Sequence, residues 1–319
     1  MTSAVTGGAF SYLGPAGTFT EMALAQVPEA QGAEWRPVHN IGEALEDVVS
    51  GRSVAAMMAI ENTVEGGVAA VLDVLASVPD LRIAGEYLVP VRFALLGLPG
   101  VPLADVRTVA AHPVAYAQCR RWLQTHLPSH TQLAATSNIQ AAQFLAGHDG
   151  TLAQAAIAPR SAADRFGLPL LADDIGDNPN AVTRFVLVER AGLRPLPPPT
   201  GADKTSLVAD LPNDRPGALL ELLEQFATRG VNLSLLHSRP IGDELGRYRF
   251  VIDLDGHLED ERVADALLGV RRFSPRVLFL GSYPRADRRP VAFSESHDDE
   301  VYAEARAWLD GLQRGGQPG

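Results

Sequence analysis

A cluster of prolines limits how this chain can fold more than any other feature of its sequence. Within residues 195–199, four of the five residues are proline. Such a run keeps the backbone extended and cannot continue a helix or a central strand, so it is typical of a semi-rigid linker. We therefore expect a linker at residues 191–203 between a first domain at 8–190 and a second domain at 204–283, followed by a tail at 284–319.

The first domain alternates short apolar runs with helical patterns, which is typical of an α/β layer structure. The expected strands are Ala9–Leu13, Val54–Ile60, Arg82–Tyr87, Val91–Leu98, Thr108–Ala111, Gln154–Ile157 and Phe185–Val188. The expected helices are Ile41–Val49, Val68–Leu75, Val114–His126 and Ile139–Leu145. A change of pattern near residues 78–82 indicates two α/β lobes with a cleft between them.

The second domain has the pattern of a βαββαβ unit, the ferredoxin-like order. Its expected strands are Thr205–Leu211, Val231–Leu236, Tyr248–Leu254 and Arg276–Leu280, and its expected helices are Ala218–Thr228 and Glu259–Leu268, with a hairpin turn at Gly242–Gly246. At the start of the first helix we expect Pro216 at N1 and Asn213 or Asp214 as the cap. We expect that helix to bury Leu219, Leu220, Leu223 and Phe226.

The tail predicts one further helix with an apolar face. That face holds Val301, Ala305, Trp308, Leu309 and Leu312. An amphipathic helix is stabilised by burying its apolar face, so we expect this one to dock on a neighbouring surface.

Composition excludes several classes of function. The formal net charge of −11 and the pI of about 5.2 disfavour nonspecific binding of nucleic acid. Cys119 is the only cysteine, so neither an intrachain disulfide nor a cysteine-based metal site is expected, and its thiol is expected to be packed. No uncharged apolar run reaches the roughly 18 residues of a membrane span, and the N-terminus lacks the pattern of a signal peptide. We therefore expect a cytoplasmic protein with no membrane partner.

Polar residues follow the predicted strands at four junctions. These junctions are Tyr12–Phe19, Ile60–Gly67, Ala111–Cys119 and Thr136–Ile139. Helix N-termini leave backbone amides free for an anion, and open α/β sheets bind ligands beyond the carboxyl ends of their strands. Each junction alone is equally well an ordinary turn. Together they predict a cleft for a small anionic ligand.

The pair Thr183-Arg184 at the last strand of the first domain adds a hydroxyl and a guanidinium. Arg184 keeps its charge, and its planar fork fits a carboxylate or a phosphate, whereas Thr183 can donate one proton. An edge-strand threonine beside a surface arginine is the plainer alternative. The sequence has no Walker loop, HExxH motif or serine elbow, and no plausible cysteine nucleophile. These patterns leave an enzyme and a binding protein both open.

Several short motifs follow one another in a distinctive order along the chain. They are Tyr12-Leu13-Gly14-Pro15, Gly17-Thr18-Phe19, Ile60-Glu61-Asn62, His112-Pro113, Gln118-Cys119, Thr183-Arg184-Phe185, Gly217-Ala218-Leu219, Asn232-Leu233 and Ser238-Arg239-Pro240. Their order resembles that of prephenate dehydratases with a C-terminal ACT domain, through about Pro284. No segment similar to chorismate mutase precedes Ala9, so the resemblance is to the monofunctional form.

This resemblance implies a two-lobed catalytic domain similar to type II periplasmic binding proteins, joined to a ferredoxin-like βαββαβ ACT domain. It implies conversion of prephenate to phenylpyruvate, with loss of water and carbon dioxide, on the route to phenylalanine. No metal or organic cofactor is implied. Because both losses make the substrate ring aromatic, the enzyme has mainly to orient the substrate and to assist departure of the hydroxide.

The resemblance also implies residue roles. Thr183 would assist the departing hydroxyl, with Glu61, Asn62 and Gln118 completing the catalytic set. The implied substrate-binding residues are Thr18, Phe19, Ser137, Asn138, Arg184 and Phe185. Arg184 either binds a substrate carboxylate, the preferred role, or supports Thr183. Some family members have serine where Ala111 stands, so one substrate contact is absent or replaced here.

The ACT resemblance implies feedback control by phenylalanine. The implied effector-site residues are Gly217, Ala218, Leu219, Leu220, Asn232, Leu233, His237, Ser238, Arg239 and Pro240. His237 stands where the family usually has glutamate, which removes a negative charge near that site. ACT domains of this kind pair side by side with the effector between them, which implies a homodimer or a homotetramer.

Two alternative functions remain at this point. The first is an arogenate dehydratase, because no residue in the sequence distinguishes the keto group of prephenate from the amino group of arogenate. The second is a noncatalytic amino-acid sensor with a solute-binding fold, against which Thr183 and Gln118 argue.

Overall fold

The computed structural model describes residues 8–64, 66–213, 215–242 and 246–315, and the chain divides into two compact units. Unit 1 comprises Met1–Val68 and Tyr87–Val186, and unit 2 comprises Ala69–Glu86 and Leu187–Gly319. Two long strands, β5 and β11, continue from one unit into the other.

The first lobe of unit 1 is built on a mixed six-stranded sheet. The strand order is β2-β1-β3-β11-β5, with β4 paired to β3, and β1 runs parallel to both β2 and β3. The bounds are β1 Ala9–Leu13, β2 Trp35–Val38, β3 Ser53–Asn62, β4 Gly66–Gly67, β5 Leu81–Pro90 and β11 Val182–Arg190. Helices α1 (Phe19–Leu24) and α2 (Ile41–Ser50), with the 3₁₀ turn η1 (Pro28–Ala30), form the crossovers that parallel strands require.

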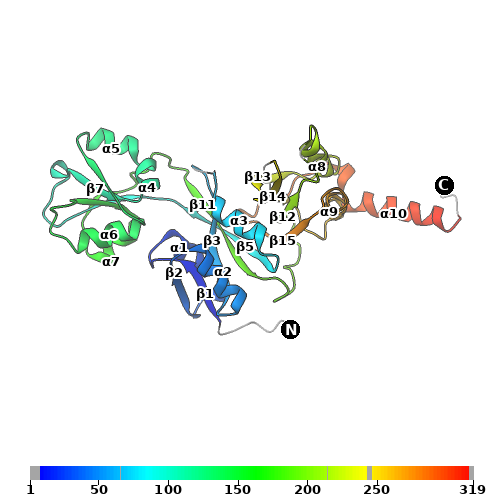
Figure 1. The fold of residues 1–319 in the computed structure, drawn as a ribbon, viewed down its shortest axis with the longest axis horizontal. Coiled ribbons are helices and arrows are strands. Elements are labelled where there is room, and N and C mark those ends of the chain that lie inside the picture. The colour runs from blue at the N-terminus through cyan, green and yellow to red at the C-terminus, as the bar shows by residue number, and fades with distance from the viewer. Residues whose placement is uncertain (1–7, 65, 214, 243–245, 316–319) are drawn as a thin grey trace. The chain divides into compact units, whose positions relative to one another are not determined.

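The second lobe has a five-stranded sheet with helices on both faces (Figure 1). Its order is β10-β6-β9-β7-β8, with bounds β6 Ala94–Gly97, β7 Thr108–Ala111, β8 Thr131–Ala134, β9 Ala155–Ala158 and β10 Leu170–Ala172. Helices α4 (Pro113–Gln118) and α5 (Arg120–His126), with Val109 and Ala111 of β7, belong to one apolar cluster, and α6 (Asn138–Ala146) and α7 (Ser161–Phe166), with Ala110, belong to the other. The 3₁₀ turn η2 (Leu103–Asp105) precedes β7.

Three expectations for this unit need correction. The single helix predicted over Val114–His126 is broken at Cys119, whose φ of −112° and ψ of 9° leave the helical region, so α4 and α5 are separate. Strands β2, β4, β8 and β10 were not predicted; Pro37 interrupts β2, the side chains of β8 are largely exposed, and β4 and β10 are very short. The short helix α7 was also missed.

Unit 2 contains a four-stranded antiparallel sheet in the order β13-β14-β12-β15. Its elements are β12 Asp203–Asp210, α8 Ala218–Ala227, β13 Leu233–Pro240, β14 Tyr248–Asp255, α9 Glu261–Phe273 and β15 Val277–Pro284, which confirms the predicted βαββαβ order. Both helices lie on one side of the sheet (Figure 1). Their buried side chains, among them Leu222, Phe226, Val263, Ala266 and Val270, pack on Leu207, Ala209, Ile252 and Leu254.

Helix α8 differs from its predicted form. It begins at Ala218 with Gly217 at the N-cap, where φ is +87°, so Pro216 lies before the helix and not at N1. The prediction that Leu219 and Leu220 are buried is also wrong, because Leu220 is 60% exposed and the core positions are Leu222 and Phe226. Asp214 and the centre of the predicted turn at residues 243–245 lie outside the described residues.

The proline-rich segment is anchored within unit 2. The fully buried Glu189 accepts hydrogen bonds at Oε1 from Arg82 Nε (2.8 Å) and at Oε2 from Arg194 Nε (2.6 Å). Further along, His257 Nε2 donates to the carbonyl of Pro197 at 3.0 Å while its Nδ1 accepts from Glu259 N, which fixes one neutral tautomer. The linker is therefore held at both its start and its middle.

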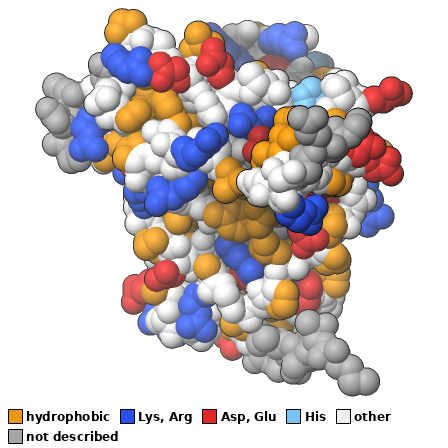
Figure 2. All heavy atoms as spheres, turned by 90° about the vertical axis from the view of Figure 1, so that its right-hand side faces the viewer, with side chains coloured by type: hydrophobic (Ala, Val, Ile, Leu, Met, Phe, Trp, Pro, Cys, Tyr) orange, Lys and Arg blue, Asp and Glu red, His pale blue; other side chains and the backbone are white. Residues whose placement is uncertain are grey.

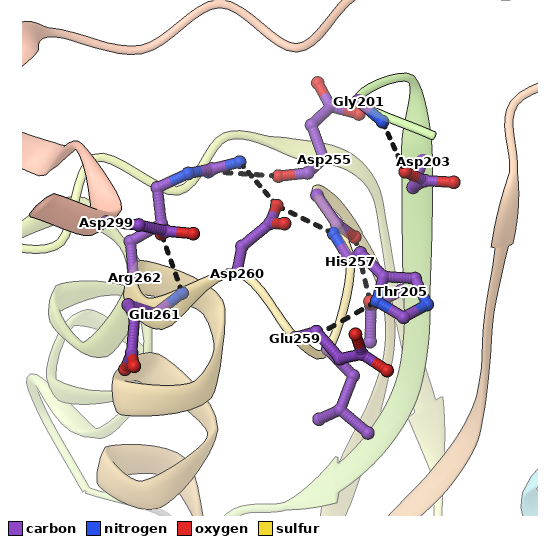
Figure 3. A network of polar contacts seen from close by, with 12 residues as sticks. Gly201, Asp203, Thr205, Asp255, His257, Glu259, Asp260, Glu261, Arg262 and Asp299 are labelled. Atoms are coloured by element: carbon purple, nitrogen blue, oxygen red, sulfur yellow. Dashed lines mark hydrogen bonds and ion pairs between the residues drawn. The ribbon is translucent and has the colours of Figure 1, made fainter. Parts of the chain in front are cut away.

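A polar network joins the turn after β14 to the start of α9 (Figure 3). The buried Arg262 donates to the carbonyl of Asp255 and to Asp260 Oδ2 (3.0 Å), which also accepts from the backbone amide of His257. Burial raises the pKa of Asp260 despite the neighbouring guanidinium. Asp299 accepts from the backbone amide of Glu261 at 2.9 Å, so the first residue of the tail helix caps α9.

The tail forms the 3₁₀ turn η3 (Glu295–His297) and the helix α10 (Asp299–Gln313), which is tied to α9 by an Arg306–Glu261 ion pair. Its apolar face remains exposed, with Trp308 at 55%, so it does not dock on the described part of this chain as predicted. Figure 2 shows hydrophobic side chains lying among Lys, Arg, Asp and Glu on the face that is turned to the viewer. Within the described residues, no helix is long and apolar enough to cross a membrane.

Candidate active site

A cavity of about 660 Å³ lies in unit 1, at the carboxyl ends of strands from both lobes. The first lobe contributes the loop after β1 and the end of β2, and the second contributes the turns before α4, α6 and α7. The lining residues are Leu13, Gly14, Pro15, Ala16, Thr18, Phe19, Thr20, Pro37, Val38, His39, His112, Thr136, Ser137, Asn138, Ile139, Gln140, Gln143 and Pro159.

Three helix N-termini converge on this cavity. The N-cap of α1 is Thr18, whose hydroxyl accepts from Glu21 N at 3.4 Å. The N-cap of α6 is Ser137, whose hydroxyl accepts from Gln140 N at 3.0 Å. The N-cap of α4 is His112, whose Nδ1 accepts from Val114 N at 3.3 Å and is therefore unprotonated. Because each N-terminus carries partial positive charge and spare amide donors, the cavity is suited to an anion.

The loop after β1 leaves little room for a side chain at Gly17. Its φ is +97°, and a Cβ there would lie 3.1 Å from Ile139 Cδ1 and 3.2 Å from Arg165 Nη1 of the opposite lobe. Glu21 holds the loop by accepting hydrogen bonds from the Gly17 amide and the Tyr12 hydroxyl. Gly17 therefore allows the two lobes to approach each other beside the cavity.

Two of the predicted substrate-binding side chains, Thr18 and Phe19, already contact other residues of the protein. The Thr18 hydroxyl donates to the carbonyl of Leu13 at 3.2 Å, so its proton is used within the loop. The Phe19 ring meets Phe93 edge to face, with centroids 5.7 Å apart. In contrast, Oδ1 of Asn138 is buried and has no hydrogen-bond partner among the described residues, which leaves an acceptor for a ligand donor.

Thr183 is paired with Asn62 across neighbouring strands. Nδ2 of Asn62 donates to Oγ1 of Thr183 at 2.8 Å, and the amide of Thr63 donates to the carbonyl of Val182, so these hydrogen bonds join the end of β3 to the start of β11. The side chain of Thr183 is largely withdrawn from solvent, at 7% exposure. Because Oγ1 already accepts one hydrogen bond, the hydroxyl proton is turned away from Asn62 and is available to another acceptor.

Arg184 lies on the other face of β11 and pairs with Glu61. The distance from Arg184 Nη1 to Glu61 Oε2 is 3.7 Å, and Arg184 is 5% exposed. Successive strand residues point to opposite faces, so Thr183 and Arg184 cannot both reach one ligand on the same face. Phe185 is part of the buried core.

The structure therefore sorts the predicted site residues into groups. Thr18, Phe19, Ser137 and Asn138 line the cavity, whereas Glu61, Asn62, Thr183 and Arg184 form two cross-strand pairs outside its lining. Gln118 is buried at the end of α4, where its carbonyl accepts from Asp177 N at 2.7 Å. The sequence did not single out His39, Gln140, Gln143 or Pro159, because their places depend on the unpredicted β2 and on side-chain positions in α6 and before α7.

The described residues contain no group of three or more His, Cys, Asp or Glu side chains that could hold a metal ion. The only cysteine, Cys119, is fully buried, and its burial raises the pKa of its thiol, so it is a packing residue, as predicted.

A second cavity, of about 470 Å³, lies in unit 2 beside the start of α8. It is lined by Leu211, Arg215, Gly217, Ala218, Leu219, Leu220, Leu223, Ser238, Tyr248 and Phe250. The exposed leucines of α8 are therefore cavity residues, which explains why they do not join the core. Among the predicted effector-site residues, Asn232, Leu233, His237, Arg239 and Pro240 lie outside this lining.

Comparison with known proteins gives matches over both parts of the chain. The family model for prephenate dehydratase matches residues 10–192, and that for the ACT domain matches residues 205–272. A prephenate dehydratase of Mycolicibacterium vanbaalenii is 43% identical over 318 residues, covering 96% of this chain and 98% of the relative.

Solved structures show the same similarity. A prephenate dehydratase from Arthrobacter aurescens, in complex with L-Phe, is 51% identical with a TM-score of 0.90, covering 96% of this chain and 99% of that one. A structure described as GqqA, a novel type of quorum quenching acylase, is 32% identical with a TM-score of 0.75, covering 88% of this chain and 100% of that one. These matches confirm the predicted fold class, a two-lobed periplasmic-binding-protein-like domain with an ACT domain, and the chain belongs to the prephenate dehydratase family.

Proposed function

We propose that this protein is a prephenate dehydratase that converts prephenate to phenylpyruvate, a carbon–oxygen lyase of phenylalanine biosynthesis in the cytoplasm. The observation that carries the proposal is the convergence of three helix N-termini, capped by Thr18, His112 and Ser137, on one cavity of about 660 Å³. Prephenate carries two carboxylates, and amide donors at helix ends bind such groups. A cavity of this size holds a substrate of about sixteen non-hydrogen atoms, within the usual range of roughly 300–1,000 Å³.

The chemistry requires one proton at the leaving oxygen. The bond to the ring carboxylate breaks and releases carbon dioxide, and its electron pair moves into the ring. That shift expels the ring hydroxyl as the ring becomes aromatic, and a proton converts the hydroxide to water. We assign the proton to Thr183, which does not line the cavity itself but whose hydroxyl is oriented by Asn62 from the neighbouring strand. Because a threonine hydroxyl is a weak acid, Thr183 relays a proton that solvent replaces.

Glu61 and Arg184 support this arrangement from the other face of the strands. Their ion pair places a protein carboxylate against the Arg184 guanidinium, so we assign Arg184 to holding the strand pair β3–β11 in register. A direct role for Arg184 as a clamp for substrate carboxylate requires Glu61 to be released. We assign Phe19, Ser137 and Asn138 to substrate binding, and Gln118 and Phe185 to support of the same region.

Phenylalanine is the proposed effector. The Arthrobacter relative holds L-Phe, and the cavity of about 470 Å³ in unit 2 brings Gly217–Leu220 together with Ser238. Its apolar lining suits an aromatic side chain. We propose that residues 8–190 form the catalytic domain, 191–203 the linker and 204–283 the ACT domain, and that ACT domains pair in a homodimer or homotetramer.

Acyl transfer, suggested by the GqqA relative, is supported less well. It calls for a nucleophile activated by an adjacent base. Among the described residues, Cys119 is buried with a raised thiol pKa, the Ser137 hydroxyl serves as a helix cap, and the Thr183 hydroxyl contacts an amide. Dehydration needs only orientation and a proton, which these groups supply.

The test is an assay of the purified protein with prephenate and, separately, with arogenate. Formation of phenylpyruvate from prephenate is the expected result. A preference for arogenate, detected as phenylalanine formation, would reassign the substrate, and turnover of neither would leave the noncatalytic sensor.

A further inference from the structure

Helix α3 (Ala69–Ser77) follows the end of β3, which carries Asn62, the hydrogen-bond partner of Thr183. After Asn62, the chain turns through β4, which pairs back on β3 with Asn62 opposite Gly66. The amide of Val68 then donates to the carbonyl of Ile60 at 2.8 Å, and α3 begins at the next residue. The Val68–Ile60 hydrogen bond therefore ties the residue before α3 to the end of β3, two positions from Asn62.

Three arginines of unit 2 hold α3, and we call them the α3 clamp: Arg239 of β13, Arg249 of β14 and Arg276 before β15. Arg239 binds Asp73 with two parallel hydrogen bonds, Nε to Oδ1 at 2.6 Å and Nη2 to Oδ2 at 2.5 Å. Such a bidentate pair fixes orientation as well as distance. Figure 1 shows α3 beside the sheet that supplies these arginines.

The other two arginines bind the end of α3. Arg249 and Arg276 both donate to the carbonyl of Ala76, at 3.2 Å each. Carbonyls in the last turn of a helix lack partners within the helix and carry partial negative charge, so guanidinium groups there are favourable. Arg249 also forms an ion pair with Asp210 of β12 at 3.5 Å. The clamp therefore holds α3 at two points, Asp73 and Ala76, which are three positions apart.

The clamp and the cavity of unit 2 occupy opposite faces of the same strand pair. Ser238 lies opposite Phe250 across β13 and β14, and both line the cavity. The next pair along, Arg239 opposite Arg249, points to the other face and reaches α3. Strand residues alternate between faces, which places the two side chains on opposite sides. Because Ser238 and Arg239 are consecutive residues of β13, a ligand that moves Ser238 moves Arg239 with it.

We propose that the α3 clamp transmits occupancy of the unit 2 cavity to Asn62 and Thr183, with Asp73 as the positioning residue that receives the signal. This inference rests on the proposed function, in which phenylalanine fills the cavity. Ligand binding favours one placement of β13, the clamp carries α3 with it, and α3 shifts the end of β3. The coupling between the two sites is an equilibrium property and therefore acts in both directions.

The primary experiment uses the full-length Asp73→Asn variant, which keeps the shape of the side chain and removes its charge. Phenylalanine affinity, measured by calorimetry, is expected to stay within about threefold of wild type, because Asp73 does not line the cavity. Inhibition of prephenate turnover at saturating phenylalanine is expected to weaken at least fivefold, the lower end of typical coupling. Asp80→Asn is the matched control, since Asp80 is an exposed carboxylate in the same segment outside the clamp.

A second variant and a binding measurement separate the possible outcomes. Arg276→Gln removes a different contact to α3 and is expected to weaken inhibition in the same direction. Independently of turnover, phenylpyruvate is expected to change phenylalanine affinity in wild type and Asp80→Asn but not in Asp73→Asn. If Asp73→Asn binds phenylalanine and is inhibited as strongly as wild type, the clamp is not the link, while the proposed function stands. If wild type turns over prephenate without any response to phenylalanine, both the effector and the clamp are refuted.

Discussion

The cavity of unit 1 and the clamp face of unit 2 handle charge in opposite ways. The cavity has no Lys or Arg among its lining residues and presents helix N-termini, hydroxyls and amides. Unit 2 instead places guanidinium groups against fixed acceptors, as in the Arg239–Asp73 pair of the clamp and in the Arg285–Asp287 pair after β15. The cavity presents partial charges to a ligand, whereas the full charges of these two unit 2 pairs are already compensated within the protein.

This difference indicates that the unit 1 cavity binds a ligand, whereas the charged pairs of unit 2 hold elements of the protein in place. Oriented amides bind an anion without the desolvation cost of bringing a guanidinium into the cavity, and they need no counter-ion in the free enzyme. Arginine–carboxylate pairs fix the relative placement of elements, which is what a regulatory unit needs. We therefore expect variants of the unit 2 pairs to change stability or coupling, and variants near the cavity to change turnover or substrate affinity.

The largest effect is expected for Glu189→Ala, which breaks the most deeply buried pair. Glu189 accepts from both Arg82 and Arg194 and has no exposed surface. Removing it leaves the buried Arg82 guanidinium without its main partner, which costs roughly 4 kcal/mol of unfolding free energy. Urea denaturation measures the loss, and Glu224→Ala, at an exposed position on α8, is the control. A loss of unfolding free energy below about 1 kcal/mol would mean that the Arg82–Glu189 pair does not stabilise the fold.

Thr183→Ala tests the opposite region and should leave stability nearly unchanged. We expect kcat with prephenate to fall roughly 100-fold, because the proton for the departing hydroxide is lost. Thr183→Ser retains the hydroxyl and should recover most of the rate. Steady-state kinetics with matched thermal melts distinguish a catalytic loss from unfolding, and near wild-type turnover by the alanine variant would remove Thr183 from the mechanism.

The fold was largely predictable because its elements depend on local patterns. Alternating and helical apolar periods predicted β1, β3, β12, β14 and most helices within a few residues, since those segments are buried on defined faces. Where burial does not set the pattern, prediction failed: β8 is mostly exposed, and the backbone at Cys119 leaves the helix without any glycine or proline to indicate it.

The site was harder to predict from the sequence than the fold, because it depends on contacts between segments that are distant in the sequence. Polar junctions that include Thr18 and Ser137 predicted a cleft for an anion, and both residues line the cavity. The pairing of Asn62 with Thr183 could be suggested only by family resemblance, because a separation of 121 positions leaves no local trace. No sequence pattern indicated that Arg239, taken as an effector-site residue, would bind Asp73.

A smaller effect is expected for Ser137→Ala, which tests whether a helix N-terminus is the anion site. Loss of the cap frays the first turn of α6, at a cost of about 1 kcal/mol, and misplaces its amides. We expect KM for prephenate to rise about tenfold with kcat changed less than about twofold. Asp298→Ala removes the cap of α10, which does not line the cavity. It should leave KM unchanged, and an equal rise in both variants would contradict a specific role for α6.

The smallest predicted effect concerns the pH dependence of a unit 2 pair. Two hydrogen bonds from Arg285, each 2.9 Å long, lower the pKa of Asp287 to about 2. Since the folded pKa lies below the ordinary value of about 3.9, the pair adds stability above pH 4 and loses it as pH falls toward 2. Partial exposure limits its contribution to about 1 kcal/mol. Urea denaturation of wild type and Asp287→Asn should therefore differ by about that amount at pH 6 and converge near pH 2. A difference that stays constant with pH would show that the Arg285–Asp287 contact acts by shape alone, unlike the charge-based contacts assigned to unit 2.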